Sequence, residues 1–279
     1  MIKLSLQSLS YRDTFNAGKI DLIGIIEKAY QLKLDGIDIH NSHFESTDKK
    51  YLEEIRNICH KKGLQICYIG VSNNFGLSGS ELKSQIEQMK HWIDIAANMG
   101  VRMVRAFGAW IPNSQNEKDV WPRMVLATRE VVEYSSSKNV VIGLHNHNHG
   151  CIPATGDQVV TLLKEIDDPY YSHILDTGQY RGSPGASEGN RGTLDENWNF
   201  YESIKISAPY AIHIRAKIYR INTGKEIWLD YDRIMPIIKE TGFNGWMSLV
   251  YEGQDQLNEI HAVPKANKFL RQILKKYSM

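Results

Sequence analysis

The stretch Val140-Val141-Ile142-Gly143-Leu144-His145-Asn146-His147-Asn148-His149-Gly150 decides how the rest of the chain is interpreted. It begins as an apolar, β-branched run, which is typical of a buried strand. Side chains alternate between the two faces of a strand, so His145 and His147 would share one face, opposite Ile142 and Leu144. Structurally inert histidines are the alternative. Two imidazoles on one face of a strand end predict a functional site there.

Segments with the composition of strands recur on both sides of this stretch, at residues 2–9, 36–40, 64–69, 101–107, 171–179, 211–217 and 246–252. Helical periodicity separates them, near residues 20–32, 47–62, 80–99, 116–137, 156–166 and 198–207, then after Asp230 and from 264 to 277. The alternation, without a Pro/Gly/Ser-rich linker, predicts one α/β domain over residues 1–279, a single (β/α)8 TIM barrel. A doubly wound open sheet is the alternative, but no glycine-rich phosphate motif follows the first strand.

Composition narrows the classes of partner. The 279 residues include 33 Lys and Arg against 32 Asp and Glu, a net charge of +1, so no basic surface for nucleic acid is expected. No apolar run approaches the ~20 residues that span a bilayer, and no signal peptide is recognisable. The three cysteines are scattered, which argues against a disulfide framework. We therefore expect a soluble, cytoplasmic protein without a nucleic-acid or membrane partner, while homo-oligomerisation remains open.

Polar side chains gather at the C-terminal ends of the predicted strands, where the active sites of such barrels are built. They are Asp38, His40, Arg105, His145, His147, Asp176, Gln179, His213, Arg215, Lys217 and Glu252. Imidazoles together with carboxylates are ligands for Zn²⁺, Mn²⁺, Fe²⁺ or Co²⁺. Simpler roles remain open for some of them: Asp176 as a turn cap, Arg105 as a buried partner of Asp38, and Glu252 as a solvated residue.

In the order of these residues the chain resembles the sugar phosphate isomerase/epimerase superfamily. These are the xylose isomerase-like TIM barrels, which also include apurinic-site endonucleases and inosose dehydratases. The family's Leu-Glu-x-His of the fifth strand stands here as 144–147, and its Asp-x-x-His of the sixth strand as 176–179. Its seventh-strand histidine matches His213. Its eighth-strand glutamate is expected at Val250, so Glu252, two residues on and on the same strand face, is the obvious substitute.

The resemblance implies a metal-dependent isomerase or epimerase that acts on a ketose, sugar phosphate or polyol through an enediolate. The expected metal ligands are His145, Asp176, His213 and Glu252, with Zn²⁺, Mn²⁺, Co²⁺ or Fe²⁺ preferred over Mg²⁺ because an imidazole replaces a carboxylate. The expected catalytic residues are His145, Glu252 and Lys217. The expected substrate-binding residues are Asp38, His40, Arg105, His147, Gln179 and Arg215.

Two other functions are compatible with this fold and these residues. A keto-sugar lyase or dehydratase would use the same enolate chemistry, and a non-catalytic carbohydrate-binding barrel would explain the loss of both family glutamates. Phosphodiester cleavage at damaged DNA fits poorly with the charge balance.

The connection over residues 180–197 is long, which favours a lid or a partner contact.

Overall fold

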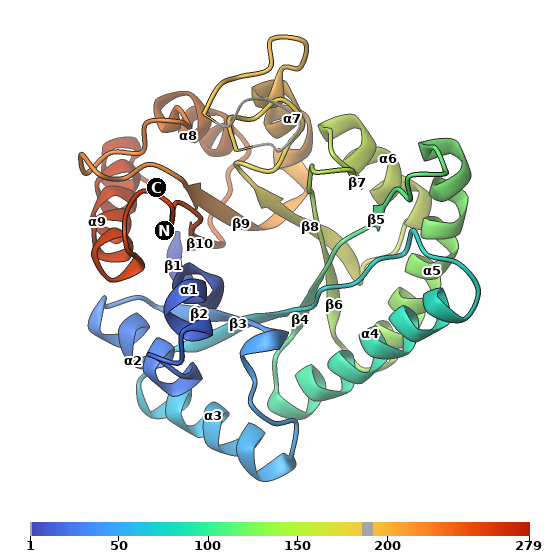
Figure 1. Ribbon diagram of the computed structural model, residues 1–279, viewed down its shortest axis with the longest axis horizontal. Coiled ribbons are helices and arrows are strands. Elements are labelled where there is room, and N and C mark those ends of the chain that lie inside the picture. Colours follow the sequence, from blue (N-terminus) through green and yellow to red (C-terminus); the bar gives the residue numbers. More distant parts are fainter. Residues whose placement is uncertain (1, 186–191) are drawn as a thin grey trace.

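The computed structural model describes residues 2–185 and 192–279 as a closed barrel of eight parallel strands, which helices surround (Figure 1). Around the barrel the strands follow the order β1, β10, β9, β8, β6, β4, β3, β2. Their bounds are Lys3–Gln7 (β1), Gly36–His40 (β2), Gln65–Gly70 (β3), Met103–Ala106 (β4), Val141–His145 (β6), Tyr171–Asp176 (β8), Ala211–Ile218 (β9) and Trp246–Tyr251 (β10). The prediction of a single (β/α)8 barrel is confirmed.

The helices that follow the strands are α2 (Leu22–Gln31), α3 (Lys49–Lys61), α4 (Gly79–Met99), α5 (Glu117–Ser137), α6 (Gly156–Ile166), α7 (Phe200–Ser207), α8 (Tyr231–Glu240) and α9 (Glu259–Tyr277). Shorter pieces are α1 (Arg12–Asn16) and three 3₁₀ turns, η1 (Ser8–Tyr11), η2 (Asn41–His43) and η3 (Ala208–Tyr210). The closing helix α9 begins before the predicted position, since the side chain of Asn258 caps it by accepting the N–H of Ile260. Pro264 therefore lies inside this helix.

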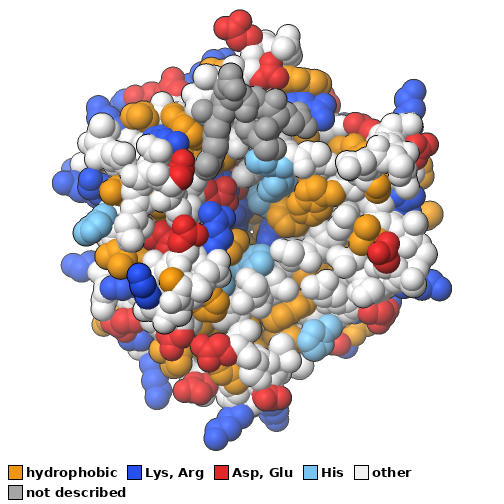
Figure 2. Space-filling model, viewed as in Figure 1, with side chains coloured by type: hydrophobic (Ala, Val, Ile, Leu, Met, Phe, Trp, Pro, Cys, Tyr) orange, Lys and Arg blue, Asp and Glu red, His pale blue; other side chains and the backbone are white. Residues whose placement is uncertain are grey.

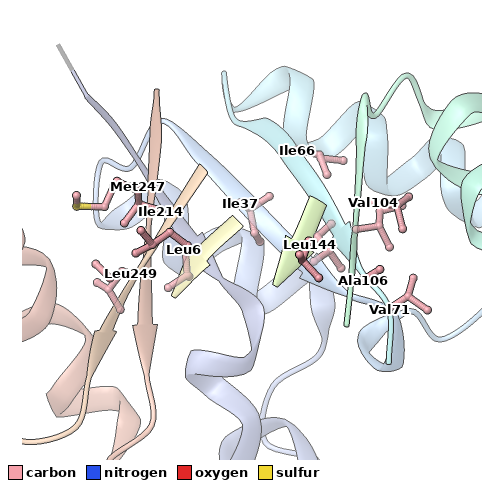
Figure 3. Close-up of a cluster of buried hydrophobic side chains, with 14 of the residues drawn as sticks. Leu6, Ile37, Ile66, Val71, Val104, Ala106, Leu144, Ile214, Met247 and Leu249 are labelled. Carbon is pink, nitrogen blue, oxygen red and sulfur yellow. The ribbon is translucent and has the colours of Figure 1, made fainter. Parts of the chain in front are cut away.

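The apolar core lies between the barrel and its helices. Figure 3 shows side chains that leave the strands on their outer faces, among them Leu6, Ile37, Leu144, Ile214 and Leu249. All five are fully buried. Because neighbouring residues on a strand face opposite ways, the residues between them point into the barrel. These interior positions carry mostly polar side chains above a small apolar base.

The apolar base inside the barrel is a separate cluster of Cys67, Tyr68, Met103 and Ile174, with Trp246 packed against it. Gly143 of β6 leaves room for this cluster. A Cβ atom there would lie 2.4 Å from Ile174 Cδ1 and 3.3 Å from Met103 Sδ. The absence of a side chain in the middle of the histidine strand is therefore a packing requirement.

Two connections shape the mouth of the barrel. Strands β5 (Ala109–Trp110) and β7 (Cys151–Ile152) form a two-stranded antiparallel sheet that joins the loops after β4 and β6. The predicted lid, residues 180–197, contains the stretch 186–191, which lies outside the described residues, so its role stays a prediction. None of the described helices is long and apolar enough to cross a membrane.

Candidate active site

Asp176, the last residue of β8, is the centre of a buried charged cluster. Its Oδ2 atom lies 3.2 Å from His145 Nε2, 3.0 Å from Arg215 Nε and 3.1 Å from Lys217 Nζ. Its Oδ1 atom accepts the N–H of Gly178 at 3.0 Å, so the carboxylate also fixes the turn after the strand. Burial acts to raise the pKa of Asp176, but the effect of Lys217, His145 and Arg215 is larger and holds that pKa well below its usual range.

Lys217 of β9 bridges Asp176 and Glu252. Its Nζ atom lies 3.1 Å from Asp176 Oδ2 and 2.7 Å from Glu252 Oε1. Both contacts are ion pairs, and they engage two of the three N–H bonds of the ammonium. Burial acts to raise the pKa of Glu252, whereas Lys217 lowers it, and the net pKa is below the usual value. Both carboxylates are therefore ionised at neutral pH, and the ammonium retains one N–H bond for a ligand.

His145 is a neutral imidazole held in one tautomer. Burial, together with Arg215, lowers the pKa of His145 well below its usual value. Its Nδ1 atom faces Arg105 Nη1 at 3.5 Å, and a guanidinium can only donate. The proton must then sit on Nε2, where it is donated to Asp176. This pairing leaves no free lone pair on His145, so the residue orients Asp176 and does not suit the general-base role that we predicted.

Arg105 of β4 is a buried cation without a carboxylate partner in the described part of the chain. Its side chain is 2% exposed, lies over the Phe107 ring at 4.2 Å, and its Nε atom has no hydrogen-bond partner. Burial, with a contribution from Arg215, lowers the pKa of Arg105 to about 9. Gly70 makes room for it, since a Cβ atom there would meet Arg105 Nη2 at 3.0 Å. A buried, unpaired guanidinium is suited to an oxygen that is anionic or becomes so.

Aromatic rings form one wall of the mouth. The rings of Phe107 and Trp110 lie 5.1 and 5.7 Å from that of His147, and the His145 ring lies 5.7 Å from His147. The Nδ1 atom of His147 lies 2.7 Å from the carbonyl oxygen of Asn148, to which it donates, so Nε2 holds the lone pair. Burial lowers the pKa of His147 to about 4. Figure 2 shows the hollow at the centre of this face, with basic, acidic, histidine and hydrophobic side chains around it.

Two predicted site residues lie in a lower layer of the barrel, away from Asp176. Asp38 accepts hydrogen bonds from Ser5 and from Ser248, and His213 Nε2 lies 3.7 Å from its Oδ2 atom. Both Asp38 and His213 are fully buried. Arg105 is therefore not the partner of Asp38, an alternative that the sequence left open. The expected roles of Asp38 in substrate binding and of His213 as a metal ligand are not supported by this placement.

The remaining predicted substrate-binding residues lie at the mouth. Gln179 donates from Nε2 to Glu252 Oε2 at 3.3 Å, and its own Oε1 atom is buried without a partner among the described residues. Arg215 donates to Asp176 and, from Nη1, to the hydroxyl of Tyr68. His40 is occupied on both ring nitrogens, by the hydroxyls of Ser42 and Ser72. Of these, Gln179 retains a free polar atom for a ligand.

We expect the lower layer to give the protein a pH-dependent stability through Asp38. Burial raises the pKa of Asp38 to about 7, against the opposing effects of Ser248, Arg215 and Ser5. Between about pH 4 and pH 7 the folded state thus binds a proton that the unfolded state has lost, so this group makes stability fall as pH rises. His213, which faces Asp38, stays neutral here because its pKa is lowered to about 3, and Arg215 stays charged.

The variant Asp38→Asn removes this titration. Relative to wild type, its free energy of unfolding should therefore improve by up to about 4 kcal/mol from about pH 4 to pH 8. Urea unfolding of both proteins at several pH values measures the difference, in which other titrating groups cancel. A difference that does not change with pH would mean that Asp38 is ionised throughout.

The residues at the mouth do not fit the divalent metal ion that the resemblance implied. In residues 2–185 and 192–279, no three His, Cys, Asp or Glu side chains are arranged to hold a metal ion. The register explains why: Asp176 pairs with Arg215 of β9, whereas His213 pairs with Ile174, one layer lower. The carboxylate oxygens of Asp176 and Glu252 already face cationic nitrogens. Among the described residues, His145, Asp176, His213 and Glu252 are therefore not arranged as the ligand set that we expected.

Several residues of the site were not expected from the sequence. Tyr68 accepts hydrogen bonds from Gln7, at 2.9 Å, and from Arg215. Ser5 and Ser248 hold Asp38. A signal existed for the serines, because each stands between two apolar residues of a strand and so faces the barrel interior. Tyr68 gave no such signal in its apolar strand.

Comparisons with known proteins place the chain among barrels of one family. A family model described as xylose isomerase-like TIM barrel matches residues 26–273. A D-psicose 3-epimerase from Clostridium cellulolyticum H10, solved with D-tagatose, is 15% identical with a TM-score of 0.75, covering 99% of this chain and 98% of that one. No curated protein matches the chain.

Two further solved structures differ in their described activities. A probable 3-DHS dehydratase from Bacillus anthracis is 18% identical with a TM-score of 0.73, covering 97% of this chain and 99% of that one. A 3-keto-D-glucoside 4-epimerase from E. coli is 14% identical with a TM-score of 0.73, covering 98% and 100%. At these identities the likeness establishes the fold.

Proposed function

The chain belongs to the xylose isomerase-like TIM barrel family, and we propose that it is a sugar isomerase or epimerase that moves a proton on the carbon next to a carbonyl group. The observation that carries the proposal is Lys217, buried between Asp176 and Glu252 where the barrel strands end. The epimerases among the solved neighbours support the reaction class. The aromatic wall of Phe107 and Trp110 supports a sugar-sized ligand with an apolar face.

In the proposed reaction the carboxylate of Glu252 takes the proton from the carbon that bears a hydroxyl next to the carbonyl. The electron pair of the broken C–H bond forms a C=C bond, and the carbonyl oxygen becomes an enediolate oxygen. When the hydroxyl proton passes to the former carbonyl oxygen and Glu252 returns its proton to the former carbonyl carbon, the product is the isomer. Protonation of the same carbon from the opposite face by a water molecule gives the epimer, and the hydroxide that remains takes the proton from Glu252.

The charge balance of the mouth favours such an intermediate. Among the described residues there, Arg105, Arg215 and Lys217 are cations, and Asp176 and Glu252 are anions. When Glu252 takes the proton, its negative charge passes to the substrate oxygen, and the three cations then stabilise the enediolate together with Asp176. Arg105 Nε has no hydrogen-bond partner, and the Lys217 ammonium has a third N–H bond beyond its two ion pairs, so we assign both groups to this oxygen.

Exchange of the substrate proton with solvent tests the proposal. We expect the wild-type protein in deuterium oxide to incorporate deuterium next to the carbonyl of one member of a panel of ketoses and 3-keto-sugars, with or without phosphate groups. Proton NMR measures both the lost signal and the new isomer or epimer. Saturable binding without exchange would contradict an enzyme and favour the carbohydrate-binding barrel, and loss of water from the sugar would favour the dehydratase alternative.

A further inference from the structure

We infer that the ammonium group of Lys217 takes the place and the electrostatic role that a divalent ion would have at this barrel mouth, so that the chain works without a metal. The inference deepens the proposed function and rests on it only for the identity of the ligand. Its starting point is the disagreement between the donor set and the metal that the resemblance implied. The described residues offer no cluster of three metal-binding side chains.

Lys217 occupies the position between the two carboxylates of the mouth. Nζ lies 3.1 Å from Asp176 Oδ2 and 2.7 Å from Glu252 Oε1, and the lysine side chain is 1% exposed. An ion bound to these same oxygens would lie within a few ångströms of Nζ and would be repelled by it. Arg215, 3.0 Å from the same Asp176 oxygen, adds a second like charge. The carboxylates are therefore satisfied by protein cations.

The same lysine can bind a substrate. Two of its three N–H bonds face the carboxylates of Asp176 and Glu252, so the third can be donated to the carbonyl oxygen of a sugar. A cation at that position lowers the energy of the enediolate without changing its own coordination. Gly178 supports the placement, because a Cβ atom there would lie 2.6 Å from Lys217 Cγ. The backbone and the lysine stem are thus fitted to each other.

The structure also indicates which substitutions would convert the mouth into a metal-binding site. Replacing Lys217 by methionine removes the competing cation at similar length, and replacing Arg215 by histidine removes the second one and adds an imidazole beside Asp176. Asp176, Glu252 and the new imidazole would then be three ligands of the kind that Mn²⁺ and Zn²⁺ accept. The double variant Lys217→Met/Arg215→His should therefore gain what the wild type lacks.

The experiment compares metal binding of the full-length wild type and of this double variant. Metal content after dialysis and calorimetric titration with Mn²⁺ and with Zn²⁺ are the readouts, and neither needs an active enzyme. We expect no stoichiometric metal and no saturable binding in the wild type, and saturable binding in the double variant that is at least about tenfold tighter than the weakest affinity the titration can resolve. Lys225→Met, which removes an exposed lysine, is the matched control and should behave as wild type.

Stoichiometric metal in the wild type, or a double variant that folds without any gain in metal affinity, would overturn the inference. If the double variant does not fold, Lys217→Gln takes its place, since it removes the charge alone. Where solvent exchange is detected, a chelator such as EDTA should leave its rate unchanged, and loss of exchange with recovery on adding metal would also overturn the inference. A wild type that is metal-free and shows no exchange would contradict the proposed function and not the absence of metal.

Discussion

Asp176→Ala should destabilise the protein by about 3–5 kcal/mol, the cost of breaking a buried ion pair from one side. The carboxylate is fully buried and faces Arg215, Lys217 and His145. Its removal leaves two cations inside the barrel with less compensation, and it also deletes the acceptor of the Gly178 N–H. Urea unfolding measures the loss of free energy, and thermal unfolding should show a fall in Tm of about 6–20 °C.

Two comparisons separate this charge effect from loss of the side chain alone. Asp157→Ala removes an exposed carboxylate at the start of α6 and should cost no more than about 1 kcal/mol. Lys217→Met should destabilise less in the Asp176→Asn background than in the wild type, because the lysine no longer has that partner. Additive effects of Lys217→Met and Asp176→Asn would contradict the coupling between Asp176 and Lys217.

The fold was predictable because the strands and the helices each have a recognisable pattern of apolar residues in the sequence. Each strand of the barrel has one apolar face against the helices, such as Leu144 in β6 and Ile214 in β9, and each is followed by a helical period. The periodicity places the start of α9 at Pro264, five residues after the actual start at Glu259, because the cap at Asn258 is a local hydrogen bond that periodicity does not report.

The sequence predicts which strand face each site residue lies on, but not its position along the barrel axis. Alternation places His213, Arg215 and Lys217 on one face of β9, and the structure confirms that all three point into the barrel. Two residues along a strand correspond to about 6.6 Å, and only the register between strands decides which of them meets Asp176. That register pairs Asp176 with Arg215. The likeness to the family favoured His213, and the predicted metal site followed from that choice.

Glu252→Gln should lower turnover by about 10²–10⁴-fold, the usual contribution of a general base. The amide keeps the size of the side chain and its contact with Gln179, 3.3 Å away, but cannot accept a proton from carbon. Lys217 holds the pKa of Glu252 below its usual value, so the wild-type base is ionised at neutral pH and activity should fall only on acidification. The rate of deuterium incorporation into substrate measures the effect.

The size of the stability change shows whether the loss of turnover is chemical. The Glu252 side chain is 22% exposed and its amide replacement keeps the contact with Gln179, so the variant should lose less unfolding free energy than Asp176→Ala, whose carboxylate is fully buried. Ligand affinity should change far less than turnover. Glu240→Gln, at the exposed end of α8, is the matched control and should retain full activity.

Full exchange in Glu252→Gln would exclude that carboxylate as the base. The proton would then have to go to Nε2 of His147, whose lone pair the carbonyl of Asn148 leaves free, and His147→Gln would be the variant that loses exchange.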